Sequence, residues 1–189
     1  MAGKPLDRKT WIALIVSLLS LLAGIALFQF SSSRFNQADI KSVQPLPVQS
    51  ETPASLMAIP LIDLKGVSQT LGDWKQPVLV INFWAPWCVP CRREVPDLIA
   101  LQREYDERIQ VIGLAFDSVE NIESFAEEYQ MNYPSYLANQ HIQMYSAVFQ
   151  NKSGALPFTA IIDRNRKIEY THTGIISLQA LRQQVSKLL

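Results

Sequence analysis

The sequence predicts an α/β domain in which helices flank a mixed central sheet, preceded by one N-terminal transmembrane helix. Three observations lead to this fold class. Beyond Leu56, short apolar runs rich in β-branched residues alternate with amphipathic helical patterns, as in a sheet covered on both faces. Residues 158–163 and 167–173 resemble an antiparallel hairpin near the end of the chain. Residues 11–30 carry no charged side chain.

The uncharged run is long enough to cross a bilayer, because twenty residues of helix rise about 30 Å. Basic residues within positions 1–10 precede it, so this short N-terminus is expected to stay cytoplasmic. We therefore expect a signal-anchor of a single-pass protein in the bacterial inner (cytoplasmic) membrane, with the C-terminal domain on the periplasmic, extracytoplasmic side. A cleaved signal peptide ending near Gly24-Ile25-Ala26 is an alternative, as is a buried core helix.

Residues 31–55 are rich in Ser, Gln and Pro and predict a flexible tether without a core of its own. The folded domain is expected to span residues 56–189. Its elements follow from hydrophobic periodicity. The sequence predicts short strands or turns at 59–64 and 66–74, strands at 78–84, 110–116, 135–138, 158–163 and 167–173, and helices at 88–105, 119–130, 142–149 and 177–188.

Composition narrows the functional classes. The chain has 17 Lys and Arg against 17 Asp and Glu, which is not the basic surface of a nucleic-acid-binding protein. It has two cysteines, too few for a disulfide-stapled scaffold. No cofactor and no nucleic-acid partner are expected.

The two cysteines are Cys88 and Cys91, in the segment Trp87-Cys88-Val89-Pro90-Cys91 directly after an apolar strand. At the start of a helix, unpaired backbone N–H groups and the helix dipole favour a thiolate, which is the species that attacks disulfides. The second cysteine lies one turn later and can resolve a mixed disulfide. We expect Cys88 to be exposed and Cys91 to be shielded.

Other interpretations of this pair are half of a zinc site, an inert structural disulfide, or two unremarkable buried cysteines. A zinc site would need two more ligands, and His141 and His172 are the histidines available. Thiol–disulfide exchange is favoured over these alternatives, and no metal is expected.

Residues 80–96, VINFWAPWCVPCRREVP, resemble the active-site segment of the TlpA/ResA branch of membrane-anchored thioredoxin-like proteins, which includes the DsbE/CcmG reductants. The resemblance extends from about Leu56 to the C-terminus. It implies a thioredoxin-like fold and a Cys88–Cys91 redox-active disulfide.

The resemblance also implies roles for other residues. Leu156-Pro157 would be the cis-proline bond that faces the disulfide, with the Leu156 backbone pairing with a substrate peptide. The alternative is that Pro157 is an ordinary proline that interrupts the edge of a strand after Gly154. Trp87 and Pro90 would contribute to the same substrate-binding surface. Glu94 matches a glutamate typical of the branch and would tune the thiols and relay a proton, unless it is a solvated glutamate paired with Arg92 or Arg93. Asn82 stands where thioredoxin has a buried aspartate, so that proton acceptor is absent.

These features predict a protein-disulfide oxidoreductase that works in the reductase direction. The resemblance implies that its substrates are disulfides of secreted proteins such as apocytochrome c. The expected partners are that substrate and a membrane electron donor, a thiol-disulfide reductase of the inner membrane, and the protein is expected to be a monomer. Three alternatives stay open: a disulfide oxidase or isomerase, a tethered binding or chaperone module with a structural disulfide, and a peroxidase. Against the peroxidase, Ala85 stands where peroxiredoxins have a Thr or Ser three residues before their reactive cysteine.

Overall fold

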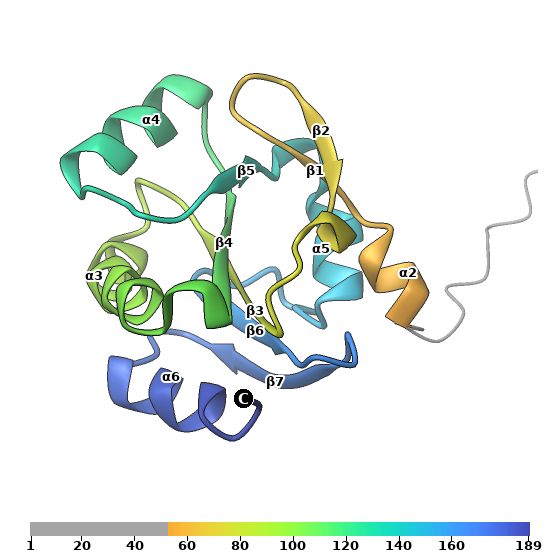
Figure 1. Cartoon of the computed structure of the whole chain (residues 1–189). Helices are drawn as coiled ribbons and strands as arrows, with labels where there is room; N and C mark the ends of the chain where they lie inside the picture. Colours follow the sequence, from red (N-terminus) through yellow and green to blue (C-terminus); the bar gives the residue numbers. More distant parts are fainter. Residues whose placement is uncertain (1–52) are drawn as a thin grey trace, which may run out of the picture. The chain divides into compact units, whose positions relative to one another are not determined.

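The structure, a computed structural model, describes residues 53–189 (Figure 1). The predicted transmembrane helix at residues 11–30 and all but the last three residues of the predicted tether lie outside the described residues. Within residues 53–189, no helix has both the length and the apolar character needed to cross a membrane.

The domain is built on a five-stranded mixed sheet with the strand order β5-β4-β3-β6-β7. Strands β3, β4 and β5 run parallel to one another, whereas β6 is antiparallel to β3 and to β7. The strands are β3 Val78–Trp84, β4 Ile109–Ala115, β5 Ser135–Leu137, β6 Phe158–Ile162 and β7 Ile168–Thr173. This arrangement confirms the predicted mixed sheet and its late hairpin.

The two central strands are buried along their whole length, which is why they consist almost entirely of apolar residues. Alternate residues of β3 face opposite sides of the sheet. Val78 and Val80 pack into one hydrophobic cluster, while Leu79 and Ile81 pack into another. Helices must therefore cover both faces.

Helices α3 and α6 lie against each other on one face of the sheet, and α5 lies on the other (Figure 1). The helices that correspond to predictions are α3 Val89–Tyr105, α4 Val119–Glu128, α5 Ile142–Val148 and α6 Leu178–Val185. Helices α4 and α6 end two or three residues before their predicted ends. Short 3-10 turns occupy Leu71–Asp73, Asp106–Arg108 and Asn139–His141.

The start of the domain contains an element that the sequence analysis did not predict. Helix α2, Pro53–Met57, begins within the segment assigned to the tether. It is followed by β1, Pro60–Ile62, and β2, Ser68–Thr70, which form an antiparallel pair. A bridge between Asp63 and Tyr136 joins this pair to the edge of the main sheet.

The topology determines where a site can form. Because β3, β4 and β5 are parallel, the segments that follow them emerge at the same edge of the sheet.

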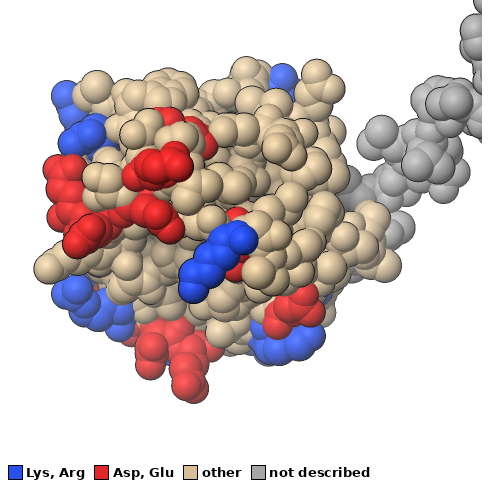
Figure 2. Space-filling model, turned by 90° about the horizontal axis from the view of Figure 1, so that it is seen from above, with Lys and Arg blue, Asp and Glu red and all other residues tan. Residues whose placement is uncertain are grey.

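Figure 2 shows the molecule from above, with acidic side chains gathered at the left, on the side where α4 lies in Figure 1, and a broad uncharged surface beside them. Helix α4 carries Glu120, Glu123, Glu127 and Glu128.

Candidate active site

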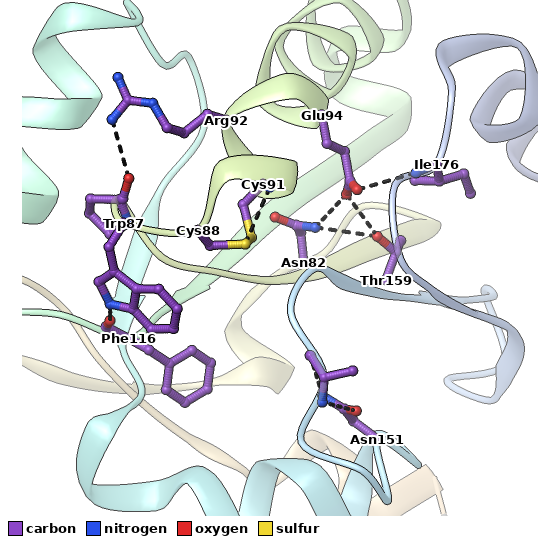
Figure 3. The surroundings of a disulfide bond; sticks show 12 residues. Asn82, Trp87, Cys88, Cys91, Arg92, Glu94, Phe116, Asn151, Thr159 and Ile176 are labelled. Atoms are coloured by element: carbon purple, nitrogen blue, oxygen red, sulfur yellow. Dashed lines mark hydrogen bonds between the residues drawn. A yellow bond between two sulfur atoms is a disulfide. The ribbon is translucent and has the colours of Figure 1, made fainter.

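Cys88 and Cys91 lie at the junction between β3 and α3, as predicted. Cys88 is the N-cap residue of α3, and its Sγ accepts a hydrogen bond of 3.3 Å from the Cys91 N–H. The two sulfurs are bonded at 2.05 Å, and the Cα atoms are 5.2 Å apart (Figure 3). Pro90 lies in the first turn of the helix, where its missing N–H costs no hydrogen bond. The structure therefore holds the pair in its oxidised form.

The predicted exposure of Cys88 is wrong for this oxidised form. Cys88 is 5% exposed and Cys91 is 1% exposed, so both are buried. The reason is the N-cap geometry, which turns the Cys88 side chain back onto the first turn of α3 and toward its partner sulfur. The exposed apolar surface comes from their neighbours Trp87, 65% exposed, and Val89, 59% exposed.

Trp87 is exposed but fixed. Its Nε1–H donates a 3.2 Å hydrogen bond to the Phe116 carbonyl, directly after β4 (Figure 3). Trp84, by contrast, is fully buried and packs on Phe125 of α4. Trp87 therefore presents an apolar contact surface beside the disulfide, whereas Trp84 belongs to the core behind it.

Arg92, the residue after Cys91, braces the loop that carries Trp87. Its guanidinium donates to the Pro86 carbonyl at 3.3 Å. It lies over the ring of Phe125 in α4 at 5.3 Å and over the ring of Tyr129, the C-cap residue of that helix, at 5.4 Å. It also pairs with Glu128 at 3.6 Å. Arg92 is thus engaged with α4, and it does not pair with Glu94.

Glu94 is a buried carboxylate with hydrogen bonds from three segments of the fold. It is 1% exposed. Its Oε1 accepts from Asn82 Nδ2 at 2.7 Å and from the Thr159 hydroxyl at 3.3 Å, and its Oε2 accepts from the Ile176 N–H at 3.2 Å. Figure 3 shows these groups converging on the carboxylate. The interpretation of Glu94 as a solvated surface residue is therefore excluded.

Burial raises the pKa of Glu94 to about 7, although the hydrogen bonds from Ile176, Thr159 and Asn82 each favour the ionised form. The nearby Asp97 carboxylate adds to the rise. A carboxyl group that titrates near neutral pH can accept and return a proton under physiological conditions. Glu94 lies one helical turn after Cys91, which fits the predicted role of Glu94 as a proton acceptor for the thiol pair.

Asn82 has a role that the sequence analysis did not assign. It is 1% exposed, and its amide donates both to Glu94 and, at 3.3 Å, to the Thr159 hydroxyl. Asn82 and Thr159 face each other across the β3–β6 ladder. The position that lacks an aspartate thus supplies the donor that holds the glutamate. A register between strands far apart in sequence carries this information, and no local signal could have revealed it.

The Leu156–Pro157 bond is cis, as the resemblance implied. Phe158, the next residue, pairs with Phe83 of β3, so Pro157 and Leu156 lie at the sheet edge where β3 leads to Cys88. The Pro157 carbonyl accepts a 2.9 Å hydrogen bond from Gly174. The structure therefore brings the cysteine pair, Trp87 and the Leu156–Pro157 segment to one edge of the sheet.

The histidines have structural surroundings. His141 packs on the Tyr145 ring, and His172 contacts the Ile175 carbonyl through Nε2 at 3.1 Å. Within residues 53–189, no three His, Cys, Asp or Glu side chains gather in a way that could hold a metal ion.

The profile of the AhpC/TSA family matches residues 50–171, a segment that contains the cysteine pair, Glu94 and Pro157. The chain belongs to this family. Ala85, three residues before Cys88, accepts a 3.1 Å hydrogen bond from the Cys88 N–H through its carbonyl and has no side-chain hydroxyl.

Curated relatives narrow the position of the chain within the AhpC/TSA family. It is 29% identical to the thioredoxin-like protein YneN of Bacillus subtilis over 182 residues, covering 94% of this chain and 97% of that protein. It is also 29% identical to the thiol-disulfide oxidoreductase ResA of Geobacillus thermodenitrificans, covering 68% of this chain and 72% of ResA.

A similar structure is that of a protein assigned as the thiol:disulfide interchange protein DsbE of Chlorobium tepidum. It has a TM-score of 0.60 and 25% identity, and the match covers 68% of this chain and 91% of that one. These relatives and the cysteine pair identify this AhpC/TSA member as a protein-disulfide oxidoreductase of the ResA and DsbE type, with a thioredoxin-like fold.

Proposed function

We propose that the protein is a membrane-tethered, extracytoplasmic protein-disulfide reductase of a bacterial inner membrane. The observation that carries the proposal is the buried Glu94 behind a cysteine pair at a helix N-terminus. A negative charge behind the pair disfavours thiolates and so favours the disulfide form. The reduced protein is then the better electron donor.

The reaction begins with the protein in its dithiol form. The Cys88 thiolate attacks one sulfur of a substrate cystine, which forms a mixed disulfide and releases the other substrate sulfur as a thiolate. The Cys91 thiol gives its proton to Glu94 and, as a thiolate, attacks Cys88 Sγ, which breaks the mixed disulfide and releases the second substrate sulfur. Glu94 returns its proton to this departing sulfur, and the first substrate sulfur takes from water the proton that Cys88 released. The substrate therefore leaves as a dithiol that has gained two electrons and two protons, and Cys88 and Cys91 are joined in a disulfide.

The protein must then be reduced again by a dithiol donor. We assign this step to a thiol-disulfide reductase of the inner membrane, because the uncharged run at residues 11–30 would place the domain on the extracytoplasmic side. The substrates are disulfides of secreted proteins, among which apocytochrome c fits the resemblance to the ResA and DsbE branch. An exposed Trp87 beside the disulfide supports a protein substrate, because it offers apolar contact area.

A trapping experiment tests this function. The full chain with Cys91→Ser should accumulate mixed disulfides through Cys88 in native membranes, because the resolving thiol is missing. The matched control, Cys88→Ser with Cys91→Ser, should capture nothing. The captured proteins, released by reductant and identified by mass spectrometry, should include secreted proteins with cysteine pairs. If the Cys91→Ser variant captures no protein, the proposed disulfide exchange is contradicted.

Direction and location need separate measurements. The reduced wild-type chain should reduce insulin disulfides, whereas net disulfide formation in reduced, unfolded ribonuclease would indicate an oxidase. If the chain does not reduce insulin and its own Cys88–Cys91 disulfide resists mild reductant, the alternative of a tethered binding or chaperone module with a structural disulfide would be favoured. A reporter fused after Leu189 should report an extracytoplasmic C-terminus, and a cytoplasmic signal would reverse the proposed topology.

A further inference from the structure

The segment between α5 and β6 contains a closed loop that ends next to the candidate active site. Phe149 and Pro157 are buried at its two ends, and the residues between them rise to the surface at positions 152–154. The loop is nine residues long from Phe149 to Pro157, and no helix or strand lies within it.

Asn151 closes this loop with its side chain. It is 2% exposed, so its amide needs hydrogen-bond partners inside the protein. Its Nδ2 donates to the Ala155 carbonyl at 3.0 Å, and its Oδ1 accepts from the Ala155 N–H at 3.0 Å (Figure 3). The Gly154 N–H adds a bond of 2.9 Å to the Asn151 carbonyl. The amide thus holds both backbone groups of one residue, as a paired strand would.

The residue held by this amide directly precedes Leu156. Within residues 53–189, no group hydrogen-bonds to the N–H or the carbonyl of Leu156. On its other side, the Pro157 carbonyl is fixed by Gly174 at 2.9 Å. The unpaired backbone of Leu156 therefore lies between two anchored residues, at the sheet edge where β3 leads to Cys88.

We propose that Asn151 is a positioning residue for protein substrates: its amide holds Ala155 and so fixes the place of Leu156, whose free backbone groups pair with an extended segment beside the substrate cystine. The inference rests on the proposed function and deepens it. It assigns as substrates proteins whose cystine lies in an accessible extended segment, and it separates their docking from the chemistry of the sulfurs. Small disulfides and dithiols have no such segment and do not use Leu156.

The test compares two reactions of the full chain. In Asn151→Ala, kcat/KM for insulin disulfides should fall about tenfold, equivalent to about 1.4 kcal/mol. The rate constant for reduction of the oxidised protein by dithiothreitol should stay within about twofold of the wild type, because this reagent needs no backbone pairing. Asn151→Ser keeps a side-chain oxygen that can accept from the loop backbone and should restore part of the insulin rate. Lys152→Ala, at the exposed tip of the same loop, is the matched control and should change neither rate.

The outcomes separate this inference from the proposed function. If the wild-type chain fails to reduce insulin, both the proposed reductase function and the proposed role of Asn151 are contradicted. An active wild type with an equally active Asn151→Ala variant overturns this inference alone. So does a parallel loss with insulin and dithiothreitol, which would indicate a general structural role, or an equal loss in Lys152→Ala. If Asn151→Ala does not fold, as judged by circular dichroism, a selective insulin defect in Asn151→Ser supports the inference, and wild-type kinetics in that variant overturn it.

Discussion

The side-chain amide of Asn82 donates a 2.7 Å hydrogen bond to the carboxylate of Glu94, and both residues are buried. This bond joins the central strand β3 to helix α3 behind the redox-active pair. It favours the ionised form of Glu94, whereas burial favours the protonated form, and burial has the larger effect. The two effects together leave the pKa of Glu94 at about 7, so a small change in its surroundings can make the carboxyl group gain or lose its proton near neutral pH.

Glu94 should make stability depend on pH. The pKa of Glu94 in the folded protein, about 7, lies above the ordinary glutamate value of 4.5, so the native state binds this proton more tightly than the unfolded state. The resulting stability is fully present below pH 4.5 and is lost as pH rises through 7. Glu94→Gln should remove this loss, which amounts to about 3 kcal/mol between the two limits.

Urea unfolding of both proteins at pH 4 and pH 8 measures that difference. Glutamine can lose the hydrogen bond from the Ile176 N–H, because its amide nitrogen cannot accept one. The resulting loss of unfolding free energy is the same at pH 4 and pH 8, so it does not affect the difference between them. The exposed Glu128→Gln variant is the control, and its unfolding free energy should change between pH 4 and pH 8 as much as that of the wild type. The same change in Glu94→Gln would contradict the raised pKa of Glu94.

Glu94 should also affect the reactivity of the thiols. Replacing its carboxylate by an amide removes a negative charge near the reduced pair, so the pH midpoint of thiol alkylation by iodoacetamide should move down by about one unit. Glu104→Gln, further along α3 and paired with Arg182, is the control, because it removes a carboxylate from the same helix at a position that does not act on Glu94. An unchanged profile in Glu94→Gln would remove Glu94 from the mechanism.

Asn82→Asp should turn the donor beside Glu94 into a second carboxyl group. Two buried carboxyl groups in contact share one proton, because both cannot ionise together. We expect little change at pH 5 but a loss of about 2–3 kcal/mol at pH 8, measured by chemical unfolding. Thr159→Val removes a donor without adding charge and should show no such extra pH dependence. Equal losses at both pH values would indicate a packing defect instead.

Trp87→Ala should weaken substrate contact while leaving the fold intact. Trp87 is 65% exposed and donates one hydrogen bond, so we expect a stability cost below about 1 kcal/mol. The kcat/KM for insulin should fall about tenfold, since exposed tryptophan surfaces dominate many protein contacts. Val67→Ala, at the exposed turn between β1 and β2, is the control. Unchanged insulin kinetics in Trp87→Ala would place substrate docking elsewhere.

Arg92→Ala and Arg93→Ala should differ, although the residues are neighbours. Arg92 donates to Pro86 and lies over two aromatic rings, so its loss should cost about 1–2 kcal/mol of unfolding free energy. Arg93 is exposed, and its replacement should cost less than about 0.5 kcal/mol. Thermal and urea unfolding would measure both, and equal costs would show that the Arg92 contacts do not stabilise the loop.

Much of the fold could be predicted because its signals are local. The continuous apolar runs of β3 and β4, the hairpin of β6 and β7 and the cysteine pair at a strand-to-helix junction each depend on a few consecutive residues. Helix α2 was not predicted, since its five residues follow a Pro- and Ser-rich stretch and carry little periodicity. The predicted exposure of Cys88 was wrong because a sequence does not show how an N-cap side chain turns.

The reactive groups can be read directly from the order of residues: two cysteines one helical turn apart, a glutamate after them and a proline directly before β6. How strongly these groups bind their protons depends on the packing of the folded chain. The groups that bond Glu94 come from positions 12, 65 and 82 residues away along the chain, and the amide behind Leu156 acts through a loop closed only in space. Desolvation and hydrogen bonding depend on what surrounds an atom, so a buried carboxyl's proton affinity is set only when distant strands and loops have packed together.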